Sequence, residues 1–276
     1  MDYAFYNGKF APYDEITLRL SDRSVFFGDG VYECMIGKCG GIFEWHEHIE
    51  RLKNGLHFIG IDFSDFKLLR ETADKLISLS EYERYTVYIQ LSRKAERRIH
   101  SPAVFGEYNL LLTVTELADF NDKEISLITK EDRRYRLCNI KTLNLLPAVL
   151  ASHEASLKKA DECVFLRDGV VTECAHSNLF ILKRGVLFTH PTGEFILPGI
   201  TRASLIEEAE KSGIGTVECE FGKAALFSAD EVLITSSTRL VRRVREIDGR
   251  TLKMNDANNA KRLIGNLRSN FINFCC

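Results

Sequence analysis

The sequence predicts an α+β protein of two domains, and three observations lead to this prediction. The chain has 276 residues, which is comfortable for two domains, and 45% of them are hydrophobic, enough to build two cores. Both halves mix β-rich segments with segments at helical spacing. The polar stretch ADFNDKE lies between the halves. We therefore expect one domain over 1–117, a linker over 118–127 and a second domain over 128–276.

The first half begins with strands. An Asn7-Gly8 hairpin signal lies between aromatic residues, and apolar residues such as Leu52 and Leu56 recur at helical spacing further on. Aromatic and β-branched runs then return on either side of a polar loop. In chain order we expect a hairpin at 3–10, strands within 16–45, helices at 46–61 and 66–80, and strands at 85–92 and 108–117.

The second half repeats the mixture. Asp168-Gly169 is a hairpin signal between two apolar runs, and Gly213 ends a helical pattern. Internal repeats, coiled-coil heptads and low-complexity tracts are absent from the sequence. In chain order we expect an extended run from 138 that turns into a helix, strands at 164–173 and 178–189, a helix at 202–211 and a strand at 231–237.

Composition restricts the possible partners and location. The 37 basic and 39 acidic residues give a formal charge of −2, so we expect neither nucleic acid nor an anionic membrane as a partner. No run approaches eighteen apolar residues, and the first residues lack the pattern of a secretory signal. We expect a cytoplasmic protein that binds a small molecule.

Cysteine and histidine spacing argues against disulfides and metal. The eight cysteines include no C-x-x-C pair, so we interpret them as free thiols, with Cys275-Cys276 as an oxidisable tail. His46 and His48 form an H-x-H pattern without an obvious third ligand, and we interpret them as solvated loop histidines. Metal, nucleotide-binding and serine-hydrolase motifs are absent, so no metal is expected.

Three features remain as candidates for chemistry. Lys141 stands in an apolar extended run, where it is either an exposed edge-strand lysine or a desolvated, nucleophilic amine able to form a Schiff base. Glu173 is expected at the end of a strand. It is either a solvated carboxylate or the group that holds a proton on a pyridine nitrogen. A Gly-Ile-Thr segment enters a helix at Thr201, which either caps the helix or helps to bind an anion. The hydroxyls that follow a buried strand could close a phosphate cup: Ser236, Ser237 and Thr238.

The ordered set of features resembles the class IV, fold-type IV pyridoxal-phosphate aminotransferases, and among them the D-amino acid aminotransferases, from about Tyr6 to Gly249. The resemblance implies a homodimer, with a small N-terminal α/β domain and a larger, β-rich pseudo-barrel domain that carries the lysine. It implies that Lys141 bonds covalently to pyridoxal 5'-phosphate and that Glu173 binds the ring nitrogen. The implied phosphate ligands are Arg51, Ile200, Thr201, Ser236 and Ser237.

The resemblance also implies a trap for the substrate carboxylate. Arg98 and His100 form an R-x-H pair in SRKAERRIHSP, and Tyr32 lies in GDGVYE, as in D-amino acid aminotransferases. Without the resemblance, the arginine-rich stretch reads as a solvated loop. The implied reaction is a ping-pong transfer of the amino group from a D-amino acid, such as D-alanine, to 2-oxoglutarate or pyruvate, with Lys141 as the general base and acid.

Several departures and alternatives remain. Ile36 stands where branched-chain aminotransferases have a pocket arginine, which counts against that subfamily. Lys94 and Ala175-His176 replace a glycine and small serines that are usual in D-amino acid aminotransferases. An aminodeoxychorismate-lyase-like enzyme of the same fold, a branched-chain aminotransferase and a non-catalytic pyridoxal-phosphate-binding protein are the alternative functions.

Overall fold

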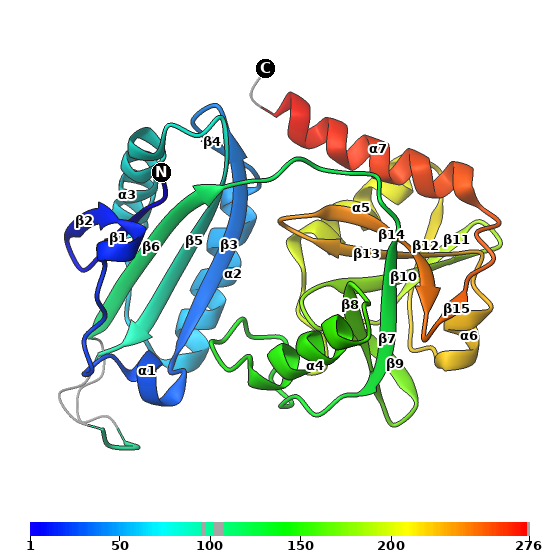
Figure 1. The fold of residues 1–276 in the computed structure, drawn as a ribbon, viewed down its shortest axis with the longest axis horizontal. Coiled ribbons are helices and arrows are strands. Elements are labelled where there is room, and N and C mark those ends of the chain that lie inside the picture. Colours follow the sequence, from blue (N-terminus) through cyan, green and yellow to red (C-terminus); the bar gives the residue numbers. More distant parts are fainter. Residues whose placement is uncertain (95–97, 102–106, 275–276) are drawn as a thin grey trace. The chain divides into compact units, whose positions relative to one another are not determined.

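The computed structural model describes residues 1–94, 98–101 and 107–274, which form two compact units, each with helices and a sheet (Figure 1). The first unit comprises Met1–Asp119 and Ile140–Asn144, and the second comprises Phe120–Asn139 and Leu145–Phe274. The α+β prediction is confirmed, because both units combine the two kinds of element.

The first unit is built on an antiparallel sheet with the strand order β2-β1-β6-β5-β3-β4. Asn7 and Gly8 form the turn of the predicted hairpin, with φ of 46° and 94°. The strands are β1 (Tyr3–Tyr6), β2 (Lys9–Pro12), β3 (Gly30–Lys38), β4 (Gly41–Ile42), β5 (Arg84–Arg93) and β6 (Tyr108–Glu116). The helices are η1 (Tyr13–Glu15), α1 (Arg23–Phe27), α2 (Trp45–Ile59) and α3 (Phe66–Ser80).

Helices α2 and α3 cover one face of this sheet (Figure 1). Their apolar residues recur at helical spacing, so each helix presents one apolar stripe to the strands. Leu56 of α2 and Leu76 of α3 are buried in one core with Ile89 of β5. This packing fixes which residues of α2 face β3, and that orientation matters for the polar cluster described below.

The second unit is built on a mixed sheet with the order β12-β11-β10-β13-β14-β7-β8-β9, with β15 paired to β14. Its strands are β7 (Ile125–Glu131), β8 (Glu162–Arg167), β9 (Val170–Cys174), β10 (Asn178–Lys183), β11 (Val186–Thr189), β12 (Gly215–Glu218), β13 (Glu231–Ser236), β14 (Leu240–Ile247) and β15 (Arg250–Thr251). Its helices are α4 (Leu146–Leu157), α5 (Ile200–Lys211), α6 (Lys223–Phe227) and α7 (Ala257–Asn273). Strand β9 ends the strand order yet also contacts β10, so the sheet curls into the expected pseudo-barrel.

The unit boundaries differ from the expected domain boundaries in two places. The units divide after Asp119, and β7 already begins at Ile125, inside the segment expected to be a linker. The lysine segment Ile140–Asn144 was expected in the second domain but groups with the first unit. The reason is backbone pairing with β3, because the Leu143 N–H donates to the Gly30 carbonyl at 3.1 Å.

The predicted free thiols and the lack of long apolar runs can also be compared with the structure. The described cysteines are all free thiols, as predicted, whereas Cys275-Cys276 lies outside the described residues. Among the residues that the structure describes, no helix has the length and apolar character needed to cross a membrane.

Candidate active site

Lys141 lies in an irregular segment and not on a strand, so the strand prediction is wrong. The segment pairs with β3 through a single bridge, Thr142 to Val31, and the Tyr32 N–H donates to the Lys141 carbonyl at 3.0 Å. The chain then enters α4 at Leu146, with Pro147 in the first turn, where its fixed φ favours a helix. The extended run is therefore too short to form a ladder.

The Lys141 amine lies against an aromatic pair of the first unit. Its Nζ is 4.3 Å from the centroid of the Tyr32 ring, which stacks on Tyr88 at 5.4 Å. The lysine is half-buried, so the alternative of an exposed edge-strand lysine does not hold. The structure thus brings together Lys141 and Tyr32, two of the residues predicted to act on substrate.

Arg51 belongs to a buried polar cluster on β3 and α2. Its Nε and Nη2 donate to the two oxygens of Glu33 at 2.8 and 2.7 Å, and His48 Nδ1 lies 2.7 Å from Glu33 Oε2. Burial alone would raise the pKa of Glu33, but the bonds from Arg51 and His48 outweigh it and lower that pKa to about 2. The carboxylate therefore stays ionised and fixes the guanidinium of Arg51.

The prediction of solvated loop histidines is wrong for His48. Both histidines lie in α2, where His46 is exposed, but His48 is buried because it shares the β3-facing side of the helix with Arg51. Burial lowers the pKa of His48, against the pull of Glu33. Within the described residues, no group of three or more His, Cys, Asp or Glu side chains could hold a metal ion.

Arg98 and His100 are exposed and lie over helix α1. The Arg98 guanidinium carbon is 5.2 Å from the Phe27 ring centroid, and the His100 ring is 5.3 Å from it, so both side chains lie against the same aromatic ring. Arg23 of α1 donates to the carbonyls of Ile99 and His100. The departure at Lys94 is exposed and forms an ion pair with Glu107 at 2.8 Å.

Glu173 is a buried carboxylate near the end of β9, so its alternative as a solvated strand-end residue does not hold. It is 5% exposed, and Arg134 Nη1 donates to its Oε1 at 2.5 Å. Asn178 Nδ2 and the Leu197 N–H donate to Oε2 at 2.9 and 3.1 Å. Burial raises the pKa of Glu173 to about 7, although the Arg134 charge opposes this shift.

Helix α5 begins with an N-terminus that no side chain caps. The cap position is Gly199 and the helix starts at Ile200, so the interpretation of Thr201 as an N-cap is wrong. The Thr201 hydroxyl is buried and, among the described residues, has no hydrogen-bond partner. An uncapped helix start presents backbone N–H groups and the positive end of the helix dipole, which together can hold an anion such as a phosphate.

The strand register brings the start of α5, Glu173 and the hydroxyl segment to one end of the second sheet. Asn178, which bonds Glu173, is paired in register with Thr235 of β13, directly before Ser236. A Cβ atom on Gly199 would lie 2.0 Å from Asn178 Oδ1, so only a glycine permits this approach of α5 to β10. Ser236 is the last residue of β13, whereas it was expected after the strand, and Ser237 begins the turn that follows.

Sequence reasoning missed the residues that surround the predicted ones. Arg134 lies in the arginine-rich stretch EDRRYR, whose spacing does not distinguish a buried arginine from solvated neighbours. Asn178 stands within the recognised segment VTECAHSN but carried no separate signal. His48 could have been found, because its i, i+3 spacing from Arg51 places both on one side of α2, whereas this spacing gives no indication of Glu33 on β3.

Comparison with known proteins places this chain in a family. The amino-transferase class IV family matches residues 30–247. D-alanine aminotransferase of Bacillus licheniformis is 35% identical over 254 residues, which cover 90% of this chain and 89% of that protein. A branched-chain aminotransferase of Thermoproteus uzoniensis has the same fold, with a TM-score of 0.90, 21% identity and coverage of 98% and 95%. The T.th. branched-chain amino acid aminotransferase solved with pyridoxamine 5'-phosphate has a TM-score of 0.86, 23% identity and coverage of 97% and 93%. The chain belongs to the class IV aminotransferases.

Proposed function

We propose that the chain is a D-amino acid aminotransferase that uses pyridoxal 5'-phosphate. It transfers the amino group of a D-amino acid such as D-alanine to 2-oxoglutarate or pyruvate in two half-reactions. The main support for this cofactor is that a buried carboxylate, Glu173, and the uncapped start of α5 lie at the same end of one sheet. Support for the substrate class comes from the similarity to D-alanine aminotransferase.

The residues of the second unit fit the two polar ends of this cofactor. The buried Thr201 hydroxyl, without a partner among the described residues, can donate to a phosphate oxygen, as can the N–H groups at the start of α5. The Glu173 carboxylate can accept a hydrogen bond from a protonated ring nitrogen. In this proposal Arg51, Ile200, Ser236 and Ser237 also bind the phosphate.

The chain's own residues divide the remaining work. When bound, pyridoxal phosphate supplies a protonated ring that withdraws electrons from the substrate Cα. Lys141 Nζ would hold the cofactor covalently and, as a free amine, would accept the proton of the substrate Cα and donate it again as a general acid. Tyr32, Arg98 and His100 bind the substrate carboxylate. We further propose that the enzyme is a cytoplasmic homodimer.

Three other functions are less well supported. Ile36 stands in place of the pocket arginine of branched-chain aminotransferases. Its side chain is uncharged and only 2% exposed in the core of the first unit, so it offers a substrate neither a charge nor an accessible surface. An aminodeoxychorismate-lyase-like reaction would not need the R-x-H pair for a simple carboxylate in both half-reactions. A non-catalytic binding protein would not need Lys141 as a proton carrier.

Borohydride reduction of the yellow, cofactor-loaded protein tests the assignment. Reduction should fix the label on the peptide that contains Lys141, and Lys141→Ala should still bind cofactor weakly but lose keto-acid-dependent amine transfer. Lys158→Ala, an exposed lysine near the end of α4, is the control and should keep full activity. A label on another lysine, or a protein that takes up no pyridoxal phosphate, contradicts the proposal.

A further inference from the structure

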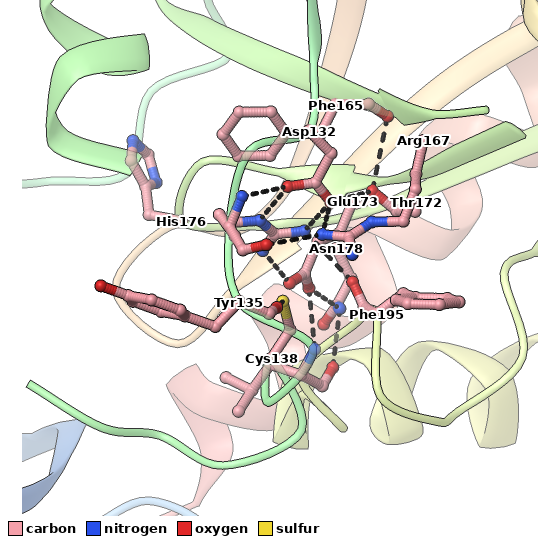
Figure 2. A network of polar contacts seen from close by, with 12 residues as sticks. Asp132, Tyr135, Cys138, Phe165, Arg167, Thr172, Glu173, His176, Asn178 and Phe195 are labelled. Atoms are coloured by element: carbon pink, nitrogen blue, oxygen red, sulfur yellow. Dashed lines mark hydrogen bonds and ion pairs between the residues drawn. The ribbon is translucent and has the colours of Figure 1, made fainter. Parts of the chain in front are cut away.

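Arg134 donates hydrogen bonds to two carboxylates of the second unit, those of Asp132 and Glu173, which Figure 2 labels within their polar network. Its Nε and Nη2 donate to the two oxygens of Asp132 at 3.0 and 2.9 Å, and Nη2 also donates to the Phe195 carbonyl at 3.1 Å. Its Nη1 donates to Glu173 Oε1 at 2.5 Å. The guanidinium carbon lies 4.5 Å from the Phe165 ring centroid, and the side chain is 12% exposed. These contacts leave the guanidinium one orientation.

The hydrogen bonds of Glu173 single out one of its oxygens. A carboxylate offers about four lone-pair sites, two on each oxygen. Oε2 accepts from Asn178 and from the Leu197 N–H, whereas Oε1 accepts from Arg134. Among these bonds the remaining site is on Oε1. A further donor, such as a ring N–H, would therefore bond the same oxygen that Arg134 bonds.

The positive charges of Arg134 and Arg167 balance the negative charges of Asp132 and Glu173, but both arginines bind Asp132 and only Arg134 binds Glu173. Asp132 also accepts from Thr172 at 3.3 Å and forms an ion pair with Arg167 at 3.2 Å. Two arginines thus divide the charge of Asp132, and the positive charge of Arg134 still attracts Glu173. Arg167 Nη2 also donates to the Arg134 carbonyl at 3.0 Å, which fixes the backbone that carries the guanidinium.

A proton shared between a carboxylate oxygen and a pyridine nitrogen rests on the stronger base. Burial makes Glu173 a stronger base than an exposed carboxylate, and its pKa is raised to about 7 even with Arg134 in place. The bond and charge of Arg134 act in the opposite direction, because they stabilise the ionised carboxylate.

We propose that Arg134 is a positioning residue that keeps the shared proton on the cofactor's ring nitrogen, by weakening Glu173 Oε1 as a base. This inference rests on the proposed function, since it requires a pyridine ring beside Glu173. It assigns the electron-withdrawing state of the ring to a pair of residues, Glu173 and Arg134. Loss of a charge-assisted bond should move the proton-sharing equilibrium about tenfold to a hundredfold toward the carboxylate.

The test is the ¹⁵N NMR shift of pyridoxal phosphate labelled at the ring nitrogen and bound to three variants and the wild type. In the wild type the nitrogen should be protonated. In Arg134→Gln it should shift toward the neutral value, and in Arg134→Lys, which retains a positive charge, it should return toward the protonated value. Arg136→Gln is the matched control, because Arg136 is an exposed arginine of the same stretch that pairs with Glu194 and not with Asp132 or Glu173, and it should leave the shift unchanged.

A second measurement needs no cofactor. In protein labelled with ¹³C-glutamate, the carboxyl signal assigned by its loss in Glu173→Gln should titrate at a higher pH in Arg134→Gln than in the wild type. Asp132 keeps Arg167 and Thr172 as partners in that variant, which favours folding. An unchanged nitrogen shift and an unchanged Glu173 titration in Arg134→Gln would overturn the inference and leave the proposed function standing. Failure of the wild type to bind pyridoxal phosphate would instead overturn the function.

Discussion

Glu33 of the first unit and Glu173 of the second are both buried glutamates bonded to an arginine, yet the pKa values of their carboxyl groups differ widely. Glu33 has a pKa lowered to about 2, and Glu173 has a pKa raised to about 7. Glu33 receives two N–H groups from Arg51 and contacts His48. Among the described residues, Glu173 receives one N–H group from an arginine, and its other two donors are neutral.

The difference shows that the sharing of charge, and not burial, separates the two sites. Arg51 gives Glu33 two parallel bonds, the strongest arrangement for this pair. Arg134 gives two of its N–H groups to Asp132 and one to Glu173. Glu33 is therefore already neutralised by the chain, whereas Glu173 retains the capacity to stabilise another cation. We interpret Glu33 as a structural residue that orients Arg51, and Glu173 as a residue that acts directly on the cofactor ring.

Glu173→Gln should have the largest effect, because it removes the carboxylate that we assign to the chemistry. Without the anion the ring nitrogen loses its proton, so single-turnover reaction with D-alanine should slow by about two to four powers of ten. Cofactor affinity should fall much less, because the phosphate contacts remain. Near-normal turnover would mean that Glu173 has no part in the chemistry.

Glu33→Gln should chiefly destabilise the fold. It leaves the guanidinium of Arg51 without its buried counter-charge, and breaking a buried pair costs about 3–5 kcal/mol. Urea unfolding of the cofactor-free chain measures this loss. Glu50→Gln is the control, since Glu50 pairs with Lys53 on the exposed side of α2 and should leave the unfolding midpoint nearly unchanged. Equal losses in the two variants would contradict the structural role of Glu33.

The pH dependence of stability should sharpen the contrast, because Glu162 resembles Glu173. Glu162 of β8 is buried, accepts the His176 N–H at 2.9 Å and the Ser177 hydroxyl at 3.0 Å, and has a pKa raised by burial to about 7. Between pH 4.5 and 7 the folded chain binds more protons at these two carboxyls than the unfolded chain does.

The free energy of unfolding of the cofactor-free protein should therefore fall as the pH rises through this window, by up to about 3 kcal/mol for each group. The contribution is fully present below pH 4.5 and lost above 7. Glu33 acts with the opposite sign and at lower pH, between about 2 and 4.5. Urea unfolding at about pH 4.5 and about pH 7.5 measures the slope, which Glu162→Gln should reduce. His48, whose pKa is lowered by burial, acts with the opposite sign in this window, so the contradicting result is a slope that Glu162→Gln leaves unchanged.

Arg98→Leu should have the smallest effect, because it alters neither carboxylate cluster. Arg98 is exposed over α1, and its contacts with a substrate carboxylate would be worth roughly 1.5–3 kcal/mol. The KM for D-alanine should rise by about one to two powers of ten, while the unfolding midpoint stays unchanged. An unchanged KM would remove Arg98 from the carboxylate trap.

The sequence was sufficient to predict local features of the fold but not their partners. The Asn7-Gly8 hairpin, the amphipathic helices α2 and α3 and strand β13 follow from spacing and turn chemistry. Lys141 was misplaced on a strand, because an apolar extended run does not reveal that only Thr142 finds a partner on β3.

Long-range pairing also explains what was missed in the candidate site. Arg134 is separated from Glu173 by 39 residues, and only the order of strands β7, β8 and β9 brings them together. Thr201 was taken as a possible cap because its residue type favours that position, whereas Gly199 takes it so that α5 can approach Asn178. Residue type predicted the candidates, and tertiary packing set their surroundings.

The ratio of kcat/KM for D-alanine to that for L-alanine, with 2-oxoglutarate as acceptor, tests the central claim most directly. If Arg98, His100 and Tyr32 fix the carboxylate and the cofactor fixes the amino nitrogen, only one enantiomer can point its Cα hydrogen at Lys141. We predict a clear preference for D-alanine in the wild type. A preference for L-alanine would contradict the D-specific assignment and leave a class IV aminotransferase with a different substrate.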